Sequence, residues 1–321
     1  MKTKTKLPLL LTVTFVMSAV MAFGQAIQDG KALFQKKQYA EAEKKFSAIS
    51  NSSKDFAEAQ YFLGRMAYSN KDFDKATDYL NEACESNSNS AEYFNWLGNA
   101  YAAIARDANF MKKGVIWPKA KAGWIKASEL DNKHLDSRLS LVRYYCNAPS
   151  FMGGSLSSAK VVANEILTIK EAEGHWQLGN ILLLEKNTID AETEFSKMVR
   201  VDSNYKRNMA SYYVDKGSYL EAFKLLDEIL KKDNTDIIAN FWYGKACALS
   251  KTNLSGGKAA LTKYLSYLPS SREPSLAQAH LHLGQIHEAI GNKQSASSHY
   301  TLAINLDENL KDAEAGLERT K

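Results

Sequence analysis

Four of the six histidines lie close together near the end of the sequence, where clustered imidazoles could bind a transition metal. They are His280, His282, His287 and His299. His280 and His287 would share a helix face, but two helical turns separate them by about 10.5 Å, too far for one metal ion. No HExxH motif and no nearby cysteine completes a ligand set. We therefore expect packing roles for these histidines, with a metal-dependent enzyme as an alternative.

Other residues capable of covalent chemistry do not form catalytic patterns. Gly256, Gly257 and Lys258 lack the glycine spacing of a phosphate-binding loop, and no GxSxG motif occurs. Paired carboxylates such as Asp72 and Asp74 lie in predicted turns or on solvated helix faces, where a charge usually serves solubility. The sequence therefore predicts no enzyme, no metal and no cofactor.

The three cysteines, Cys84, Cys146 and Cys247, are far apart in the sequence. Their spacing fits neither a CxxC metal site nor a disulfide framework. Each lies in an apolar helical pattern, so we expect small buried apolar residues. One disulfide with a leftover thiol is the alternative if the compartment is oxidising.

The first residues indicate the compartment. Lys2, Lys4 and Lys6 precede the apolar run Leu7 to Phe23, and small residues follow at the position of a cleavage site. This pattern is typical of a secretory signal peptide, residues 1–24, cut before Gln25. An uncleaved membrane anchor is the alternative, because the run is nearly long enough to span a bilayer. We expect a periplasmic or secreted bacterial protein with no stable membrane insertion after cleavage.

Removal of the signal peptide also changes the charge balance. Residues 1–24 hold three lysines and no acidic residue, so the 41 Lys and Arg fall to 38 against 36 Asp and Glu. A nucleic-acid surface needs a net basic stripe, and the mature chain is nearly neutral. We therefore expect no nucleic-acid partner.

The elements that must position any functional side chain are helices, because apolar residues recur at helical spacing in units of about 34 residues. In the last unit, Leu283-Gly284 precedes a turn and is followed by Ala296, Tyr300 and Ala303. The same order recurs upstream, as in Leu63-Gly64, Ala76, Leu80 and Ala83. A small residue in each helix lets the two backbones approach, while the large residues fill the space between neighbouring helix pairs.

In this order and period the chain resembles the tetratricopeptide repeat family. The resemblance implies an all-α fold: a right-handed α-solenoid of about eight helical hairpins with a C-terminal capping helix. Residues 25–321 would form one such domain. Its expected repeats are residues 26–54, 57–88, 91–132, 135–170, 172–203, 204–234, 237–270 and 277–308, with the cap at 310–319.

Two consecutive repeats carry extra residues between their helices. Tyr101 and Ala120 are nineteen positions apart, and Tyr145 and Ala159 are fourteen apart, where about nine is usual. We expect loops at 106–118 and 147–156, with Pro118 at a helix start or turn. Since the turns of stacked hairpins lie on one edge and adjacent helices pack about 8–10 Å apart, the loops should touch.

The expected loops bring several apolar residues to that edge, which we call the docking edge. It consists of Phe110, Met111, Ile116, Trp117, Phe151 and Met152. Gly114, Gly153 and Gly154 are expected to allow positive φ and close backbone approach. Either the two loops only bury each other's apolar groups, or the edge binds a partner.

The resemblance also implies a peptide-binding groove on the inner face of the first helices. Its expected residues are Tyr61, Arg65, Tyr68, Asn95, Asn99, Arg143, Trp176, Asn180, Arg207, Phe241 and Lys245. Amides can bond a peptide backbone, aromatic rings can cover side chains, and arginine can pair with a carboxylate. The family's carboxylate clamp is not reproduced, because Trp176 stands where that clamp needs lysine.

Together these features predict a non-catalytic scaffold or adaptor of the bacterial cell envelope that binds a protein or peptide in the groove. A glycan- or small-ligand-binding module is an alternative, since Trp176 and Tyr61 could also stack on such ligands. The sequence does not specify the partner or the oligomeric state.

Overall fold

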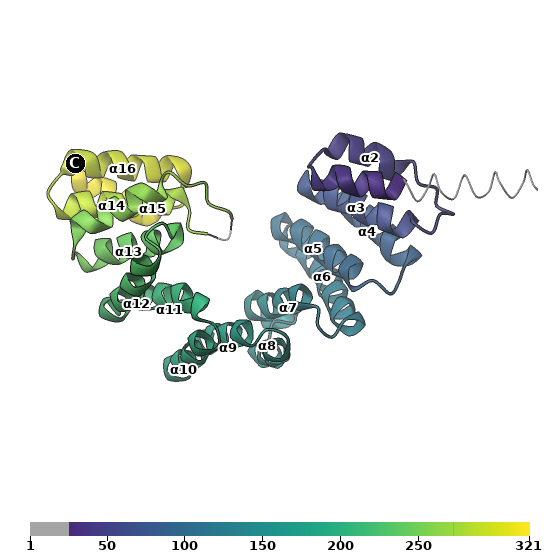
Figure 1. Cartoon of the computed structure of the whole chain (residues 1–321), viewed down its shortest axis with the longest axis horizontal. Helices are drawn as coiled ribbons and strands as arrows, with labels where there is room; N and C mark the ends of the chain where they lie inside the picture. Colours follow the sequence, from purple (N-terminus) through teal and green to yellow (C-terminus); the bar gives the residue numbers. More distant parts are fainter. Residues whose placement is uncertain (1–25, 272) are drawn as a thin grey trace, which may run out of the picture. The chain divides into compact units, whose positions relative to one another are not determined.

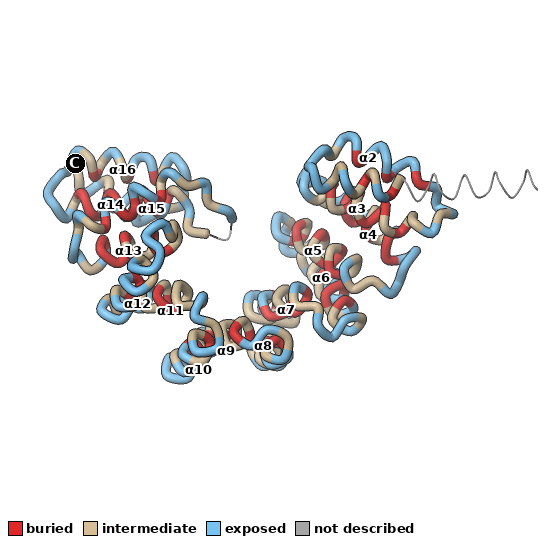
Figure 2. Tube along the Cα trace, in the orientation of Figure 1, coloured by how far each residue is buried: buried red, intermediate tan, exposed pale blue. Residues whose placement is uncertain are grey.

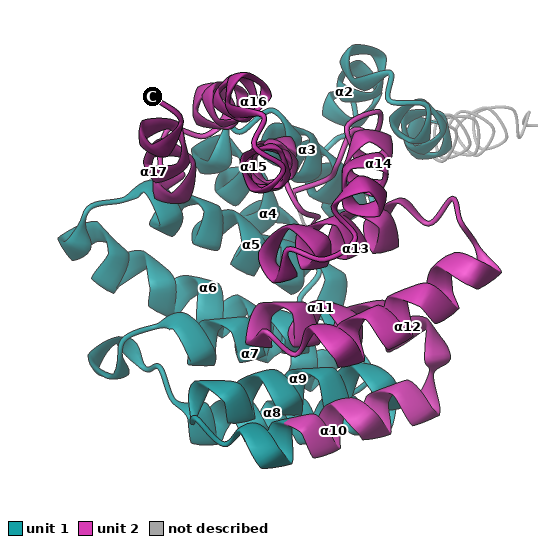
Figure 3. Ribbon diagram, turned by 90° about the vertical axis from the view of Figure 1, so that its left-hand side faces the viewer, with its two compact units in different colours: residues 1–191 teal, residues 192–321 magenta. Residues whose placement is uncertain are grey.

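The computed structural model describes residues 26–271 and 273–321, and the predicted signal peptide lies outside this part of the chain. Within it the regular structure consists of α-helices and short 3-10 helices, with no strand, and the helices follow one another as hairpins (Figure 1). The predicted all-α class is confirmed. The chain divides into two compact units, Met1–Ala191 and Glu192–Lys321, which Figure 3 distinguishes by colour.

Unit 1 begins its described part with helical residues 26–35. Its further helices are α2 (Tyr39–Ser47), α3 (Phe56–Ser69), α4 (Phe73–Ser86), α5 (Ala91–Asp107), α6 (Phe110–Leu130), α7 (Leu135–Asn147), α8 (Leu156–Ile169) and α9 (Glu171–Leu184). A short 3-10 helix, η1 (Ser150–Met152), lies between α7 and α8. Helix α10 (Thr188–Val201) contains the boundary between the units.

Unit 2 continues with further helical hairpins. Its elements are η2 (Ser203–Tyr205), α11 (Lys206–Lys216), α12 (Tyr219–Lys232), α13 (Ile237–Ser250), α14 (Leu254–Tyr264), α15 (Leu276–Ala289), α16 (Lys293–Leu306) and α17 (Lys311–Thr320). Helix α17 covers the last hairpin, since its Ala313 packs with Leu281 and Tyr300 in one buried cluster.

Small residues explain why the two helices of each hairpin pack so close together. A Cβ placed at Gly64 of α3 would lie 2.6 Å from Leu80 of α4, and one at Gly284 of α15 would lie 2.6 Å from Tyr300 of α16. The large residue of the second helix therefore occupies the space left by the glycine of the first. Buried residues accordingly lie along the facing sides of the helices (Figure 2).

The first expected loop, 106–118, is helical instead. Helix α5 runs to Asp107 and α6 begins at Phe110, where the Asn109 side chain accepts a hydrogen bond from the Lys112 backbone N–H at 3.0 Å. Pro118 lies inside α6 and not at a helix start or turn as expected. The extra residues therefore lengthen the hairpin, because an N-cap that satisfies a free backbone donor starts the helix early.

The second insertion is a turn, and its glycines differ in their roles. Gly153 has a φ of 91°, as expected. Gly154 allows close approach, because a Cβ there would lie 1.7 Å from the carbonyl oxygen of Ala148. Gly114 does neither: it lies within α6 with nothing within 4 Å of a Cβ position.

Candidate functional site

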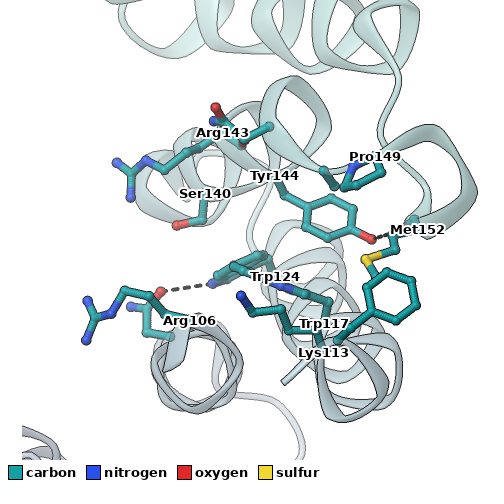
Figure 4. A pocket seen from close by; sticks show the side chains of 13 residues that line it. Arg106, Lys113, Trp117, Trp124, Ser140, Arg143, Tyr144, Pro149 and Met152 are labelled. Atoms are coloured by element: carbon teal, nitrogen blue, oxygen red, sulfur yellow. Dashed lines mark hydrogen bonds between the residues drawn. The ribbon is translucent and has the colours of Figure 1, made fainter. Parts of the chain in front are cut away.

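The two lengthened repeats of unit 1 enclose a cavity of about 550 Å³ between α5, α6, α7 and the η1 turn, which we call the central pocket (Figure 4). Its apolar lining is Phe110, Trp117, Trp124, Tyr144, Ala148, Pro149 and Met152. Its polar lining is Asn99, Arg106, Lys113, Ser140, Arg143 and Asn147. The pocket thus combines a large aromatic surface with a small number of polar groups, as ligand sites commonly do.

Three aromatic side chains form the apolar wall. The rings of Trp117 and Tyr144 lie 5.8 Å apart, and those of Trp124 and Tyr144 lie 6.5 Å apart. Trp124 is 4% exposed, and its Nε1–H donates to Oδ1 of Asn99 at 2.9 Å. Because Trp124 and Tyr144 are buried and the Trp124 indole N–H has its partner, these two rings are held in place before any ligand arrives.

The η1 turn supplies the remaining side of the wall. The Tyr144 hydroxyl donates to the carbonyl oxygen of Met152, and burial raises the pKa of Tyr144, which keeps this donor neutral. The turn is closed by backbone bonds from Gly154 to Pro149 (3.1 Å) and from Ser155 to Tyr145 (2.9 Å). These contacts position Met152 against α7.

The charged groups of the central pocket are all cations. Arg106, Lys113 and Arg143 line it, and none of its thirteen lining residues is Asp, Glu, His or Cys. Arg106 pairs with its neighbour Asp107 at 3.5 Å, where both side chains are exposed. Within residues 26–271 and 273–321, Lys113 and Arg143 have no ion pair. An anionic group entering the pocket would therefore meet unneutralised positive charge.

A second hollow, of about 370 Å³, adjoins the central pocket and shares Phe110, Trp117 and Met152 with it. Met111 and Phe151 complete its apolar lining together with Pro118 and Gly114. The exposed fractions of Phe110, Met111 and Phe151 are 67%, 80% and 70%, and the two phenylalanine rings lie 5.8 Å apart.

The two insertions therefore meet, yet they leave a large apolar surface uncovered. Five of the six docking-edge residues line the two hollows. Ile116, the sixth, is half-buried and lines neither of them.

Two of the predicted groove residues of α3, Tyr61 and Arg65, contact each other. The Arg65 guanidinium lies over three rings, those of Phe34, Tyr61 and Trp96, at 5.0, 5.4 and 4.7 Å, and donates to the Tyr61 hydroxyl at 3.1 Å. Tyr61 in turn donates to Glu92 at 2.9 Å. Hydrogen bonds led by that from His134 hold the pKa of Glu92 at about 2. Arg65 is therefore engaged within the protein.

The remaining predicted groove residues of unit 1 differ from one another in burial and in their contacts. Asn95 is buried and Tyr68 is half-buried against Trp96. The side-chain amide of Asn180 donates to the carbonyl of Trp176 at 2.7 Å. Of all eleven groove residues, only Asn99 and Arg143 line the central pocket.

In unit 2 the predicted groove cations are paired and the predicted aromatic is buried. Arg207 lies 3.4 Å from Asp236, and Lys245 lies 2.6 Å from Asp215. Phe241 is 1% exposed and packs against the ring of Tyr264 at 5.0 Å, so its expected place on an open groove wall is corrected. The reason is that α13 packs against both α14 and α15, which buries this face.

Several pocket residues were not singled out from the sequence. Arg106 and Lys113 lie inside the first insertion. Their positive charge, close in sequence to several apolar residues, was the signal that could have indicated a binding site here. Trp124 and Tyr144 occupy ordinary packing positions of their helices. Only the meeting of α5, α6 and α7 shows that both rings also line a cavity.

The histidines of the last hairpin form a stacked cluster. Nδ1 of His280 lies 3.0 Å from Nδ1 of His299, and the ring of His287 stacks on that of His299 at 5.3 Å. His282 lies apart and bonds Gln285 at 2.8 Å. In the part of the chain that the structure describes, no group of three or more His, Cys, Asp or Glu residues is arranged to hold a metal ion.

Protonation of these histidines is expected to destabilise α15 and α16. Burial lowers the pKa of His282 and of His299 from 6.5 to about 4, and it lowers that of His280. The unfolded chain then binds more protons below about pH 6.5, so the stability present above that pH is lost as the pH falls toward about 4. Hydrogen exchange of α15 and α16, corrected for intrinsic rates, should be faster at about pH 5 than at about pH 7.

The matched variants for this test are His299→Gln and His134→Gln. The first removes one half-buried titrating ring and should reduce the acid-induced exchange in α15 and α16. The second changes a histidine of unit 1 and should leave it unaltered. Equal exchange at both pH values in the unmodified protein would show that the cluster does not titrate as burial requires.

The three cysteines, all within the described part of the chain, are free thiols. Cys84 and Cys247 are buried, and burial raises the pKa of each to about 12. Cys146 is half-buried and its pKa is also raised by burial. Such thiols are poor nucleophiles, because the reactive form is the thiolate.

Within residues 26–271 and 273–321, no helix combines the length and the apolar character needed to span a bilayer.

Comparison with known proteins supports the helical repeat. Residues 28–92 and 277–310 match family models described as tetratricopeptide repeat. A comparison with curated proteins found no match. A solved tetratricopeptide repeat protein from Parabacteroides merdae is similar at 12% identity, over 94% of this chain and 99% of that one, with a TM-score of 0.52. This similarity shows the fold alone.

A second similar structure is the C-terminal part of a TPR repeat-containing protein from Cytophaga hutchinsonii. Its identity is 17%, over 91% of this chain and 99% of that one, with a TM-score of 0.46.

Proposed function

Because residues 28–92 and 277–310 match tetratricopeptide repeat models, we propose that the chain is a non-catalytic scaffold that binds a segment of another protein in the central pocket of unit 1. Tetratricopeptide repeat proteins are generally protein-interaction scaffolds. The central pocket gives this chain a recess in which such a segment could bind.

One observation carries the proposal: residues predicted for two separate surfaces converge on one cavity. Asn99 and Arg143 come from the predicted groove, whereas Phe110, Trp117 and Met152 come from the docking edge. The cavity volume of about 550 Å³ lies within the range of ligand sites. The extra residues of the two lengthened repeats therefore build a recess with both apolar and polar contacts.

The lining favours binding over catalysis. General acid–base and nucleophilic catalysis use His, Asp, Glu, Cys, Lys or an activated hydroxyl. Among these groups the central pocket offers Lys113, Ser140 and Tyr144. The Tyr144 hydroxyl donates to the Met152 carbonyl, and within the described residues no hydrogen bond joins Lys113 to Ser140.

A glycan ligand is less well supported. That alternative relied on Tyr61 and Trp176 as stacking surfaces. Tyr61 is buried, with its hydroxyl bonded to Glu92 and its ring packed beneath Arg65. The ring is therefore covered by the protein's own side chains.

We further propose that the protein is exported and acts in the bacterial cell envelope. The support is the signal-peptide pattern of residues 1–24, which lie outside the described residues. Mass spectrometry of the protein isolated from cells should find Gln25 as the first residue. A chain that retains Met1 to Gly24 would count against export by this signal.

The binding proposal is tested with three fluorescein-labelled probe peptides. They share leucine and phenylalanine at i, i+4 spacing and differ only at the remaining positions, which are glutamate, glutamine or lysine. Fluorescence anisotropy measures their affinities. At least one peptide should bind, and Trp117→Ala should weaken that binding about tenfold or more, because Trp117 is shared by both hollows.

The matched control is Trp176→Ala, which removes the same side chain from α9 outside the central pocket. It should leave the affinity unchanged, and circular dichroism checks that both variants fold. Binding that is lost in Trp176→Ala but kept in Trp117→Ala would reject the central pocket. If no probe peptide binds, the proposal fails as well.

A further inference from the structure

The central pocket has a cationic end and an apolar end. In Figure 4, Arg106 and Arg143 lie on one side of the cavity, and Met152 lies on the other with Tyr144 and Trp117 between them. A ligand that fills the cavity therefore meets guanidinium groups at one end and an aromatic and thioether surface at the other. This polarity restricts the chemistry of the occupant.

The positive charge of Arg143 is available to a ligand, whereas Arg106 pairs with Asp107 at 3.5 Å where both side chains are exposed. Arg143 has no ion pair within the described part of the chain, and no carboxylate lines the cavity. Arginines and lysines elsewhere on the predicted groove are already used: Arg65 by three aromatic rings, Arg207 by Asp236 and Lys245 by Asp215. Among the predicted groove cations, Arg143 is thus the one whose guanidinium N–H groups have no partner in the described part of the chain.

We infer that the bound segment carries a carboxylate side chain close to a large apolar side chain, an inference that rests on the proposed function. The carboxylate pairs with Arg143, whose guanidinium can donate two parallel N–H bonds, and Arg106 lies at the same end of the cavity. The apolar side chain lies against Trp117, Tyr144 and Met152, where its burial supplies most of the affinity.

The occupant is a protein segment and not a small amphiphile, because the apolar surface continues beyond the cavity. Met111 and Phe151 lie in the adjoining hollow and remain largely exposed. Lys113 of α6 adds a further cation to the lining of the central pocket itself. An acidic amphipathic segment can place separate apolar side chains in both hollows, whereas a single fatty acid or aromatic acid offers one apolar chain or ring.

The test compares the glutamate, glutamine and lysine probe peptides on the full chain. At a salt concentration of about 0.05 M, the glutamate peptide should bind about tenfold tighter than the glutamine peptide, and the lysine peptide should not bind. Raising the salt to about 0.5 M should reduce the advantage of glutamate, because exposed charges are screened. Arg143→Gln should bring the glutamate peptide to within about twofold of the glutamine peptide.

Two controls keep the result specific. Arg200→Gln makes the same charge change on α10, outside the central pocket, and should not alter the preference. The affinity of the glutamine peptide should be equal in Arg143→Gln and the unmodified protein, which shows that the pocket is intact.

The outcomes separate this inference from the proposed function. If the glutamine peptide binds as tightly as the glutamate peptide and Trp117→Ala weakens both, the pocket binds peptides but the acidic preference is wrong. If Arg143→Gln weakens both peptides equally, the arginine acts through the fold and the inference fails. Co-sedimentation with phosphatidylglycerol vesicles, without binding of the glutamate peptide, would assign the edge to a membrane surface and overturn it.

Discussion

Trp124→Ala is expected to lower the free energy of unfolding of unit 1 by about 3–5 kcal/mol. Trp124 is 4% exposed and packs between α5 and α7, where its indole fills the space left by Gly98. Alanine leaves a cavity at the centre of the lengthened hairpin and leaves Oδ1 of Asn99 without its donor. Urea denaturation followed by circular dichroism measures the change, because the substitution removes one of the four tryptophans of unit 1 and so alters the fluorescence signal itself.

Trp124→Phe is the control for this prediction. Phenylalanine keeps most of the apolar volume but removes the Nε1–H donor, so the loss should be about 1–2 kcal/mol. If Trp124→Phe destabilises the protein as much as Trp124→Ala, the hydrogen bond to Asn99 matters more than packing. The account of the pocket wall as a packed aromatic surface would then need revision.

Gly154→Ala is expected to destabilise unit 1 by about 3 kcal/mol, at the upper end of the usual range for overpacking. The new Cβ would lie 1.7 Å from the carbonyl oxygen of Ala148, which is backbone and cannot rotate away. The turn must open, and Met152 then loses its place beside Tyr144. Tryptophan fluorescence during urea unfolding reports this well, since Trp96, Trp117, Trp124 and Trp176 all lie in unit 1.

Gly114→Ala provides the matched substitution within the same pair of insertions. Nothing lies within 4 Å of its Cβ position and the residue is helical, so stability should be unchanged or higher by up to about 1 kcal/mol. Similar losses for Gly154→Ala and Gly114→Ala would contradict the difference that the structure assigns to these two glycines.

The helical hairpins were predictable because their signals are local. Leu283-Gly284 and Tyr300 lie within one repeat, and the close approach of Tyr300 to Gly284 is the contact that their spacing encodes. The extension of α6 was not predicted, because Gly114 and Pro118 suggest a turn when considered alone. The N-cap at Asn109 allows the helix to begin before both of them.

The candidate site was predictable only in part, because pairing and burial depend on neighbouring helices. Arg65 and Arg143 occupy similar places in the repeat pattern, yet Arg65 is covered by three rings and Arg143 faces the cavity. Phe241 matched the groove pattern but is buried by the packing of α13 against α14 and α15. These differences arise from contacts between elements, which a repeat pattern does not specify.

Hydrogen exchange of the full chain with and without the glutamate probe peptide tests the central claim most directly. If the central pocket is the binding site, protection should appear in residues 106–118 and 140–156 and not in α13 to α16. Protection along α9, α11 and α13, with none around the pocket, would show that the segment binds at the predicted groove instead.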